Sequence, residues 1–152
     1  MYKQILFGSD LTSDSLQIGE KTVTLAKLFN ATLSIVHVVE PPMAYQKESP
    51  KLTQALAELK TDAAKGLEEF SNKLSIPKQN QFINIGIPKI QIIKKAMDLN
   101  ADLLVLASYG TGGSQHSMGS TAHGIIKTAP CDVLLVNTSS LTPVKIKDDR
   151  IF

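Results

Sequence analysis

Short runs of apolar residues recur along the chain and predict buried strands. They cover residues 2–8 (YKQILFG), 32–39 (TLSIVHVV), 103–107 (LLVLA) and 133–136 (VLLV). Runs of this length and composition are typical of strands that are covered on both faces of a parallel sheet. A weaker run at residues 81–85 (QFINI), interrupted by polar residues, predicts a fifth strand at an edge of the sheet.

A helical period appears between these strands. Apolar and small residues recur every three or four positions in four segments, which we expect to form core-facing helices. These stripes are Leu16, Gly19, Val23 and Ala26; Leu52, Leu56, Leu59, Ala63, Leu67, Phe70 and Leu74; Ile90, Ile93 and Met97; and Ala122, Ile125 and Ala129. Strands that alternate with helices indicate right-handed crossovers between parallel strands. We therefore predict an α/β fold with an open, doubly wound sheet of five parallel strands in the order 3-2-1-4-5.

Two segments interrupt this alternation. Residues 40–50 (EPPMAYQKESP) contain three prolines, so we expect an exposed loop there. Residues after the last strand are expected to fray, although several of them are apolar enough to dock. Because the length of 152 residues suits one domain, we predict a single domain over residues 1–139 and a C-terminal tail over residues 140–152.

Composition narrows the class of function. Hydrophobic residues make up 43% of the chain and charged residues 20%, as in ordinary globular proteins. A net charge of +2 with scattered basic residues gives no indication of nucleic-acid binding. The chain has no long apolar run and no signal-peptide pattern, so we expect a cytoplasmic protein that does not bind membranes. The single cysteine and the three histidines argue against a disulfide and a dedicated metal site.

Glycine and hydroxyl residues gather after two of the predicted strands. In a doubly wound sheet, ligands bind beyond the carboxyl ends of the strands, where the strand order reverses. Gly8-Ser9-Asp10 follows the first strand, residues 108–113 (SYGTGG) follow the fourth, and Gly119-Ser120-Thr121 precedes the last helix. Glycines allow close backbone approach, and a helix N-terminus favours phosphate. The pattern predicts a nucleotide phosphate site; a flexible loop before an ordinary capped helix is the alternative.

Two common nucleotide motifs are absent from the sequence. A Walker loop needs a lysine after its last glycine, and a dinucleotide fingerprint needs GxGxxG after the first strand. Among other candidates, we expect His37 to be a packed core residue and Cys131 a small buried hydrophobe. We expect His116 to be solvated, and His123 has no acidic neighbour in sequence to orient it. No nucleophile, base and orienting residue occur together, so we predict no catalytic residues.

The whole chain resembles the universal stress protein (UspA) family over roughly residues 2–137. The similarity lies in ILFGSD, IVHVVE, Gly86-Ile87-Pro88, ADLLVLASYG, GGS followed by GS, and APCDVLLV. Members that bind ATP have G-x-x-G, nine residues and then G-[S/T]. Here the corresponding positions are Ala107 to Gly110, eight residues, and Gly119-Ser120, so alanine replaces the first glycine and the spacer is one residue shorter. A loop tolerates such a deletion, and the resemblance implies the branch that binds ATP.

The resemblance also implies a Rossmann-like fold, similar to the adenine-nucleotide alpha hydrolases, and a set of binding residues. Asp10, with Ser9 beside it, and Val38 would lie at the adenine and ribose end. Leu106, Ala107, Tyr109 and Gly110 would line the ribose and α-phosphate, and Gly119, Ser120, Thr121 and Ala122 the phosphates. Helix N-capping is a second interpretation of Asp10. The ligand would be ATP, or AMP or ADP, with Mg²⁺ carried mainly by the phosphates and water.

The expected function is that of a dimeric regulatory protein of the stress response, with a protein partner that the sequence does not identify. The run Val133–Val136 contains no charge or proline, which is a liability at an edge strand unless it pairs with another copy. The resemblance likewise implies a homodimer through residues 132–137. ATP hydrolysis should be slow at most, because residues 111–121 contain no Lys or Arg.

Two alternatives remain open. One is a dimeric interaction module that has lost the nucleotide site, consistent with Ala107 and the shortened spacer. The other is an enzyme such as a nucleotidyl transferase. It would need a histidine-rich HxGH signature after the first strand, where this chain has Gly8-Ser9-Asp10-Leu11.

Overall fold

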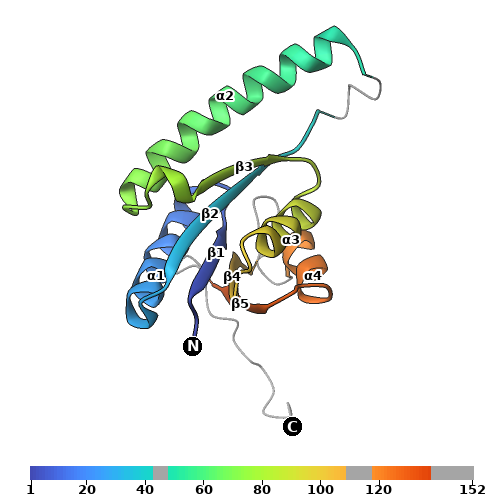
Figure 1. The fold of residues 1–152 in the computed structure, drawn as a ribbon. Helices are drawn as coiled ribbons and strands as arrows, with labels where there is room; N and C mark the ends of the chain where they lie inside the picture. The colour runs from blue at the N-terminus through green and yellow to red at the C-terminus, as the bar shows by residue number, and fades with distance from the viewer. Residues whose placement is uncertain (43–47, 109–117, 138–152) are drawn as a thin grey trace, which may run out of the picture.

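Five parallel strands form one sheet in the order β3-β2-β1-β4-β5, which confirms the predicted fold (Figure 1). The structure is a computed structural model and describes residues 1–42, 48–108 and 118–137. The strands are β1 (Gln4–Gly8), β2 (Thr32–Val39), β3 (Gln81–Ile85), β4 (Leu103–Ala107) and β5 (Asp132–Val136). The interrupted run at residues 81–85 is an edge strand, as its polar positions indicate.

Four α-helices cover the two faces of the sheet, α1 and α2 on one face and α3 and α4 on the other (Figure 1). They are α1 (Ser13–Phe29), α2 (Pro50–Lys73), α3 (Pro88–Asp98) and α4 (Ser120–Ile126), and a short 3-10 helix, η1 (Lys78–Asn80), precedes β3. Residues 43–47 of the predicted loop at residues 40–50 lie outside the described residues. Ser49 caps α2, because its side chain accepts the N–H of Leu52. The predicted tail lies outside the described residues.

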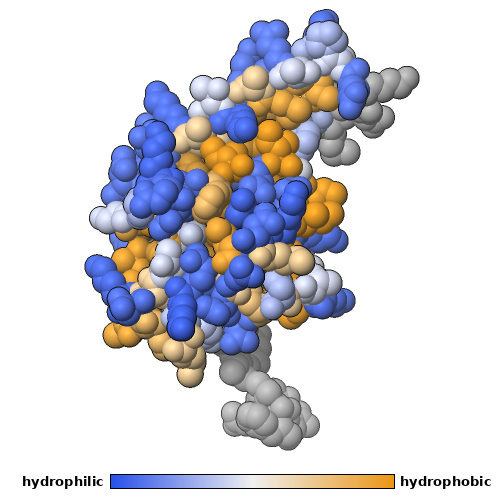
Figure 2. Space-filling view, viewed as in Figure 1, coloured by the Kyte–Doolittle hydropathy of each residue, from blue (hydrophilic) through white to orange (hydrophobic). Residues whose placement is uncertain are grey.

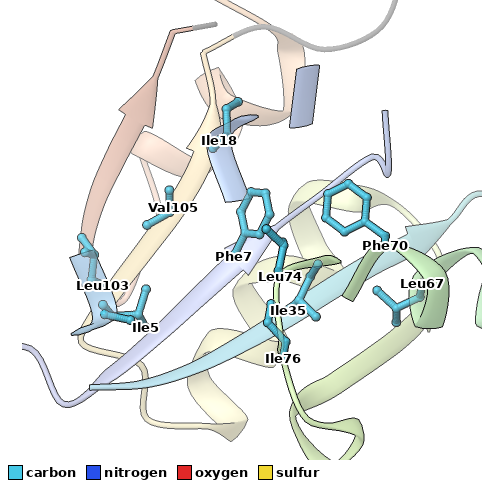
Figure 3. Packing of buried hydrophobic residues seen from close by; sticks show 11 residues of the cluster. Ile5, Phe7, Ile18, Ile35, Leu67, Phe70, Leu74, Ile76, Leu103 and Val105 are labelled. Atoms are coloured by element: carbon cyan, nitrogen blue, oxygen red, sulfur yellow. The ribbon is translucent and has the colours of Figure 1, made fainter. Parts of the chain in front are cut away.

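Each face of the sheet has its own apolar core. Under α1 and α2, Phe7 lies near Phe70 of α2 and near Leu74, the residue that ends this helix (Figure 3). The ring centroids of Phe7 and Phe70 are 6.4 Å apart. Under α3 and α4, the cluster comprises Leu6, Val36, Ile92, Ala96, Leu104, Leu106 and Ile125. Alternate residues of β1 thus enter opposite cores, as the side-chain period of a strand requires. The two cores fix β1 at the centre of the sheet.

The position of β1 creates the point at which the strand order reverses. Gly8 pairs with Val36 of β2 on one side of β1, and Phe7 pairs with Val105 of β4 on the other. The helix that follows β1 in sequence, α1, lies on one face of the sheet, and the helix that follows β4, α4, lies on the other (Figure 1). The connections therefore diverge at the carboxyl ends of β1 and β4, where a crevice is expected.

Hydrophilic residues cover much of the face seen in Figure 2, and apolar residues gather along and beneath α2. Although α2 has 24 residues, its first turns carry Lys51, Glu58 and Lys60 on exposed positions. Among the helices that the structure describes, none is long and apolar enough to cross a membrane.

Candidate functional site

A cleft of about 700 Å³ opens at the carboxyl ends of β1, β2 and β4. Its volume lies within the range of small-molecule sites, roughly 300–1,000 Å³. The lining residues come from the strand ends and from the adjoining parts of α1, α3 and α4: Gly8, Ser9, Asp10, Ser15, Val36, His37, Val38, Glu40, Pro88, Ile92, Leu106, Ala107, Met118, Gly119, Ser120, Thr121 and Ala122. The cleft occupies the crevice that the strand order creates.

The structure brings most of the predicted site residues together in this cleft. Nine of the eleven line it: Ser9, Asp10, Val38, Leu106, Ala107, Gly119, Ser120, Thr121 and Ala122. The other two, Tyr109 and Gly110, lie outside the described residues, as does His116. Ligand binding by the nine residues stays a prediction, but the single location that it requires is present.

Asp10 braces the N-terminus of α1 without capping it. Thr12 is the N-cap, and its hydroxyl accepts the N–H of Ser15. Thr12 in turn donates its own N–H and hydroxyl to Oδ1 of Asp10, at 3.1 and 2.7 Å. The interpretation of Asp10 as the helix cap is therefore wrong. Among the described residues, Oδ2 of Asp10 has no hydrogen-bond partner, so this oxygen is available to a ligand.

Ser9 anchors the turn between β1 and α1. Its buried hydroxyl lies 2.6 Å from the hydroxyl of Ser15 and accepts the N–H of Leu11 at 3.0 Å. Leu11 has a φ of 62°, in the left-handed region that non-glycine residues seldom adopt. The turn is thus held in one conformation by side-chain bonds on both sides of Asp10.

His37 lies in the wall of the cleft, which corrects the expectation that it is a packed core residue. Its side chain is half-buried, and its Nδ1 lies 2.9 Å from the carbonyl oxygen of Ser9. The alternation of side chains along a strand does not show where the core ends, so it could not indicate that His37, near the carboxyl end of β2, lies beyond the core. Its position directly before Val38 is the signal that could have indicated a place in the site.

Close packing at the base of the cleft depends on Gly8. A Cβ at this position would lie 2.6 Å from Cδ2 of Leu106, so a larger residue would require the buried Leu106 side chain to shift. Ala107, which stands where ATP-binding relatives have glycine, packs against the core cluster under α1 and α2. Its small side chain lines the cleft without closing it.

The first turn of α4 supplies backbone donors to the cleft. Gly119 is the N-cap, with no side chain to satisfy the N–H groups that follow, and these groups have no partner within the helix. The Ser120 and Thr121 hydroxyls lie at the same end. Gly119 has φ −59° and ψ 151°, which any residue can adopt. Its conformation is therefore unstrained, and what glycine provides here is space.

The charged side chains that line the cleft in the described structure are acidic. Asp10 and Glu40 line it, and no Lys or Arg is found among its described lining residues. No group of three His, Cys, Asp or Glu side chains in the described ranges could hold a metal ion. A highly charged phosphate group would therefore need a cation bound to it, because the described lining offers it only hydroxyl and N–H donors.

Several lining residues are not among the binding residues that the resemblance implies, although Gly8 belongs to the glycine and hydroxyl pattern after the first predicted strand. They are Gly8, Ser15, Val36, His37, Glu40, Pro88, Ile92 and Met118. Pro88 and Ile92 come from α3, which the sequence alone does not place over the cleft; the Gly86-Ile87-Pro88 motif is their one signal. Gly86 has a φ of 143° and makes the turn from β3 into α3.

Other features of the chain lie away from this cleft. A hollow of about 590 Å³ between the C-terminal ends of α1 and α2 contains none of the predicted site residues. Cys131 is half-buried against the core under α3 and α4, and burial raises the pKa of its thiol. His123 is exposed on α4 and does not line the cleft.

Known proteins are similar to this chain in fold and in sequence over nearly its whole length. Residues 1–137 match the Universal stress protein family. Universal stress protein A homolog 1 of Coxiella burnetii is 35% identical over 138 residues, covering 89% of this chain and 96% of the relative. The solved structure of UspA from Lactobacillus plantarum aligns with a TM-score of 0.71 at 26% identity, covering 89% of this chain and 97% of that one.

A universal stress protein solved in complex with cAMP has the same fold. It aligns with a TM-score of 0.62 at 22% identity and covers 91% of this chain and 98% of that chain. With the family match over residues 1–137, these likenesses show that the chain belongs to the universal stress protein family.

Proposed function

We propose that the cleft binds an adenine nucleotide, ATP or else ADP or AMP, and that occupancy regulates the protein in a stress response. One observation carries the proposal: nine residues expected to touch a nucleotide lie around a single cleft at the reversal of strand order. The cAMP complex of a family member supports an adenine nucleotide as the ligand class.

The cleft offers an apolar wall for an adenine ring. Val36 and Ile92 belong to the core under α3 and α4, and Val38 and Pro88 line the cleft beside them. A flat aromatic ring between such side chains buries apolar surface. Oδ2 of Asp10, which has no hydrogen-bond partner among the described residues, would accept a hydrogen bond from an amino or hydroxyl group of the nucleoside.

The first turn of α4 would bind the phosphates. Its N–H groups and the hydroxyls of Ser120 and Thr121 are donors, and they lie where the family motif has Gly-Ser. Because the described lining includes two carboxylates and no cation, a triphosphate would enter as its Mg²⁺ complex. Phosphates and water would hold most of the Mg²⁺ coordination positions, and the hydroxyl oxygens of Ser120 and Thr121 could fill the remainder.

We further propose that the protein is a homodimer through residues 132–137. Among the described strands, β5 pairs with β4 alone, so its other edge presents main-chain groups with no strand partner in that part of the chain. Leu134 on this strand is 40% exposed. A second copy pairing along β5 would satisfy these groups and cover the apolar side chains.

Denaturing mass spectrometry of freshly purified protein tests the nucleotide proposal. We expect adenine nucleotide to be released from wild-type protein, because a tightly bound ligand accompanies the protein through gentle purification. Protein with Gly119→Val, purified identically, is the control and should release none. Equal nucleotide in both preparations, or none from wild-type protein even after incubation with Mg-ATP, would contradict the proposal and favour the interaction module.

A further inference from the structure

His37 continues the pairing of β1 with β2 beyond the end of the backbone ladder. The N–H of Ser9 donates to the carbonyl oxygen of Val36 at 3.1 Å. The carbonyl oxygen of the same residue lies 2.9 Å from Nδ1 of His37. Both main-chain polar groups of Ser9 are thereby bonded to β2, one through its backbone and one through an imidazole.

The acceptor fixes the tautomer of this ring. A carbonyl oxygen only accepts hydrogen bonds, so Nδ1 of His37 carries the proton. In the neutral ring, Nε2 then keeps its lone pair. The ring is half-buried in the wall of the cleft, and its Nδ1 is bonded to the carbonyl oxygen of Ser9.

The turn after Ser9 needs such support. Leu11 holds a φ of 62°, and an unfavourable conformation of this kind persists only where surrounding contacts determine it. Within the turn, Ser9 bonds Leu11 and Ser15 through its hydroxyl, and Asp10 bonds Thr12. Among the hydrogen bonds between described residues, the one from His37 ties this set to the neighbouring strand through a side chain from outside the turn.

We infer that His37 is a positioning residue, which holds the Ser9 carbonyl so that the turn presents Asp10 to the cleft and thereby sets nucleotide affinity. This role rests on the proposed function, in which Asp10 binds the nucleoside. His37 acts through Ser9, and the hydrogen on Nδ1 carries the effect.

Three variants separate the hydrogen bond from the shape of the ring. His37→Phe keeps an aromatic ring and removes both nitrogens, whereas His37→Asn keeps an N–H donor near the position of Nδ1. His123→Phe is the matched control, because that histidine is exposed and lies outside the cleft lining. For each protein, calorimetry with Mg-ATP gives the Kd, and hydrogen exchange reports the Leu11 and Thr12 amides without ligand.

We expect His37→Phe to raise the Kd for Mg-ATP by about threefold to tenfold, the effect of one lost hydrogen bond. The same change should speed exchange at Leu11 and Thr12 by a similar factor. His37→Asn should recover most of both effects, and His123→Phe should change neither. A second measurement needs no variant: ¹⁵N NMR of wild-type protein with a neutral His37 ring should show a protonated Nδ1 and an unprotonated Nε2.

Three results would overturn the inference. They are wild-type affinity and exchange in His37→Phe, equal losses in His37→Phe and His37→Asn, and a ring protonated on Nε2 alone. If wild-type protein binds no nucleotide, the proposed function fails, while the exchange and tautomer measurements still test the support of the turn. If His37→Phe does not fold, the tautomer and the His37→Asn variant decide.

Discussion

The backbone N–H of Gly119 donates to the carbonyl oxygen of Ser108 at 2.9 Å, which joins the residue after β4 to the N-cap of α4. The spacer of the nucleotide motif is one residue shorter here than in the family pattern, and Gly119, the residue that follows it, nevertheless lines the cleft. With the shorter spacer, the first turn of α4 still lines the cleft. This contact is the structural reason to retain the nucleotide proposal despite the departure in sequence.

Two helical glycines should respond oppositely to alanine. A Cβ at Gly19 would lie 2.5 Å from Cδ1 of Leu74 and 3.1 Å from Cε1 of Phe7, both buried. We expect Gly19→Ala to lower the free energy of unfolding by about 1–3 kcal/mol, because the core must shift. At Gly66 the nearest atom, Cδ1 of Leu11, would be 3.6 Å away, an ordinary contact. Gly66→Ala should therefore stabilise α2 by about 0.5–1 kcal/mol.

Urea unfolding of the two variants and the wild-type protein measures both effects. If Gly19→Ala and Gly66→Ala destabilise the protein equally, the close approach of α1 to Leu74 is not the reason for the effect at position 19.

Asp102 should make the stability of the fold depend on pH. Its carboxylate accepts the N–H groups of Lys3 and Gln4, at 2.8 and 2.9 Å, and these bonds lower the pKa of the carboxyl. A pKa that is lower in the folded state gives stability that is present above the unfolded pKa, about 4, and is lost as pH falls through the folded value. Asp102→Asn should therefore be less stable than wild-type protein at neutral pH.

Urea unfolding of the Asp102→Asn and wild-type proteins between about pH 7 and pH 3 checks this dependence. The difference between the two proteins should shrink toward the acid end of the range. Asp62→Asn, at an exposed position of α2, is the control and should show little difference at any pH. A difference for Asp102→Asn that stays constant down to the lowest pH would show that charge is not involved.

The edge of β5 should carry the homodimer. Leu135 packs against the core under α3 and α4, so its replacement would also disturb the fold, whereas Leu134 is 40% exposed. We expect light scattering at micromolar concentration to find a dimer for wild-type protein and a shift to monomer for Leu134→Lys. Leu28→Lys, at a position of α1 that is 78% exposed, should leave the dimer intact. A wild-type monomer would contradict the proposed interface.

Hydrolysis of Mg-ATP should be slower than about 1 per second, which is slow for an enzyme. The described lining of the cleft includes no Lys or Arg, and neither does the sequence of residues 111–121. The transferred phosphoryl group would thus lack the cationic stabilisation that rapid turnover needs. Faster phosphate release that is lost in Asp10→Asn or His116→Ala would reveal catalytic groups in the protein. Activity that survives in both variants would indicate a contaminating ATPase.

The sequence predicts the fold well where the signal is local. The stripe from Leu52 to Leu74 has the helical period, and α2 covers Pro50–Lys73. Contacts between distant segments leave no such period. β1 begins at Gln4 rather than Tyr2, since the N–H groups of Lys3 and Gln4 bond Asp102, and the hydroxyl of Tyr2 bonds Asp132.

The same limit applies to the candidate site. Motif residues such as Gly119 and Ser120 could be predicted because their order along the chain matches a family pattern. The sequence pattern predicts His37 in the core, because an apolar strand pattern does not show which residue reaches the sheet edge. The left-handed Leu11 has no composition signal either, since its conformation is fixed by Ser9 and its neighbours.

Calorimetric titration of Mg-ATP into wild-type, Gly119→Val and Ser120→Ala proteins tests nucleotide binding at α4 most directly. Because the φ and ψ of Gly119 suit valine, the Gly119→Val protein should remain folded by circular dichroism, and its branched side chain should abolish binding. Ser120→Ala should weaken binding by roughly 3-fold to 100-fold, the effect of one hydroxyl hydrogen bond to a phosphate. Thr128→Ala, in the turn that follows α4, should bind like wild-type protein. No heat from folded wild-type protein at millimolar Mg-ATP, or equal affinity in all four proteins, would contradict binding of the phosphates at this helix.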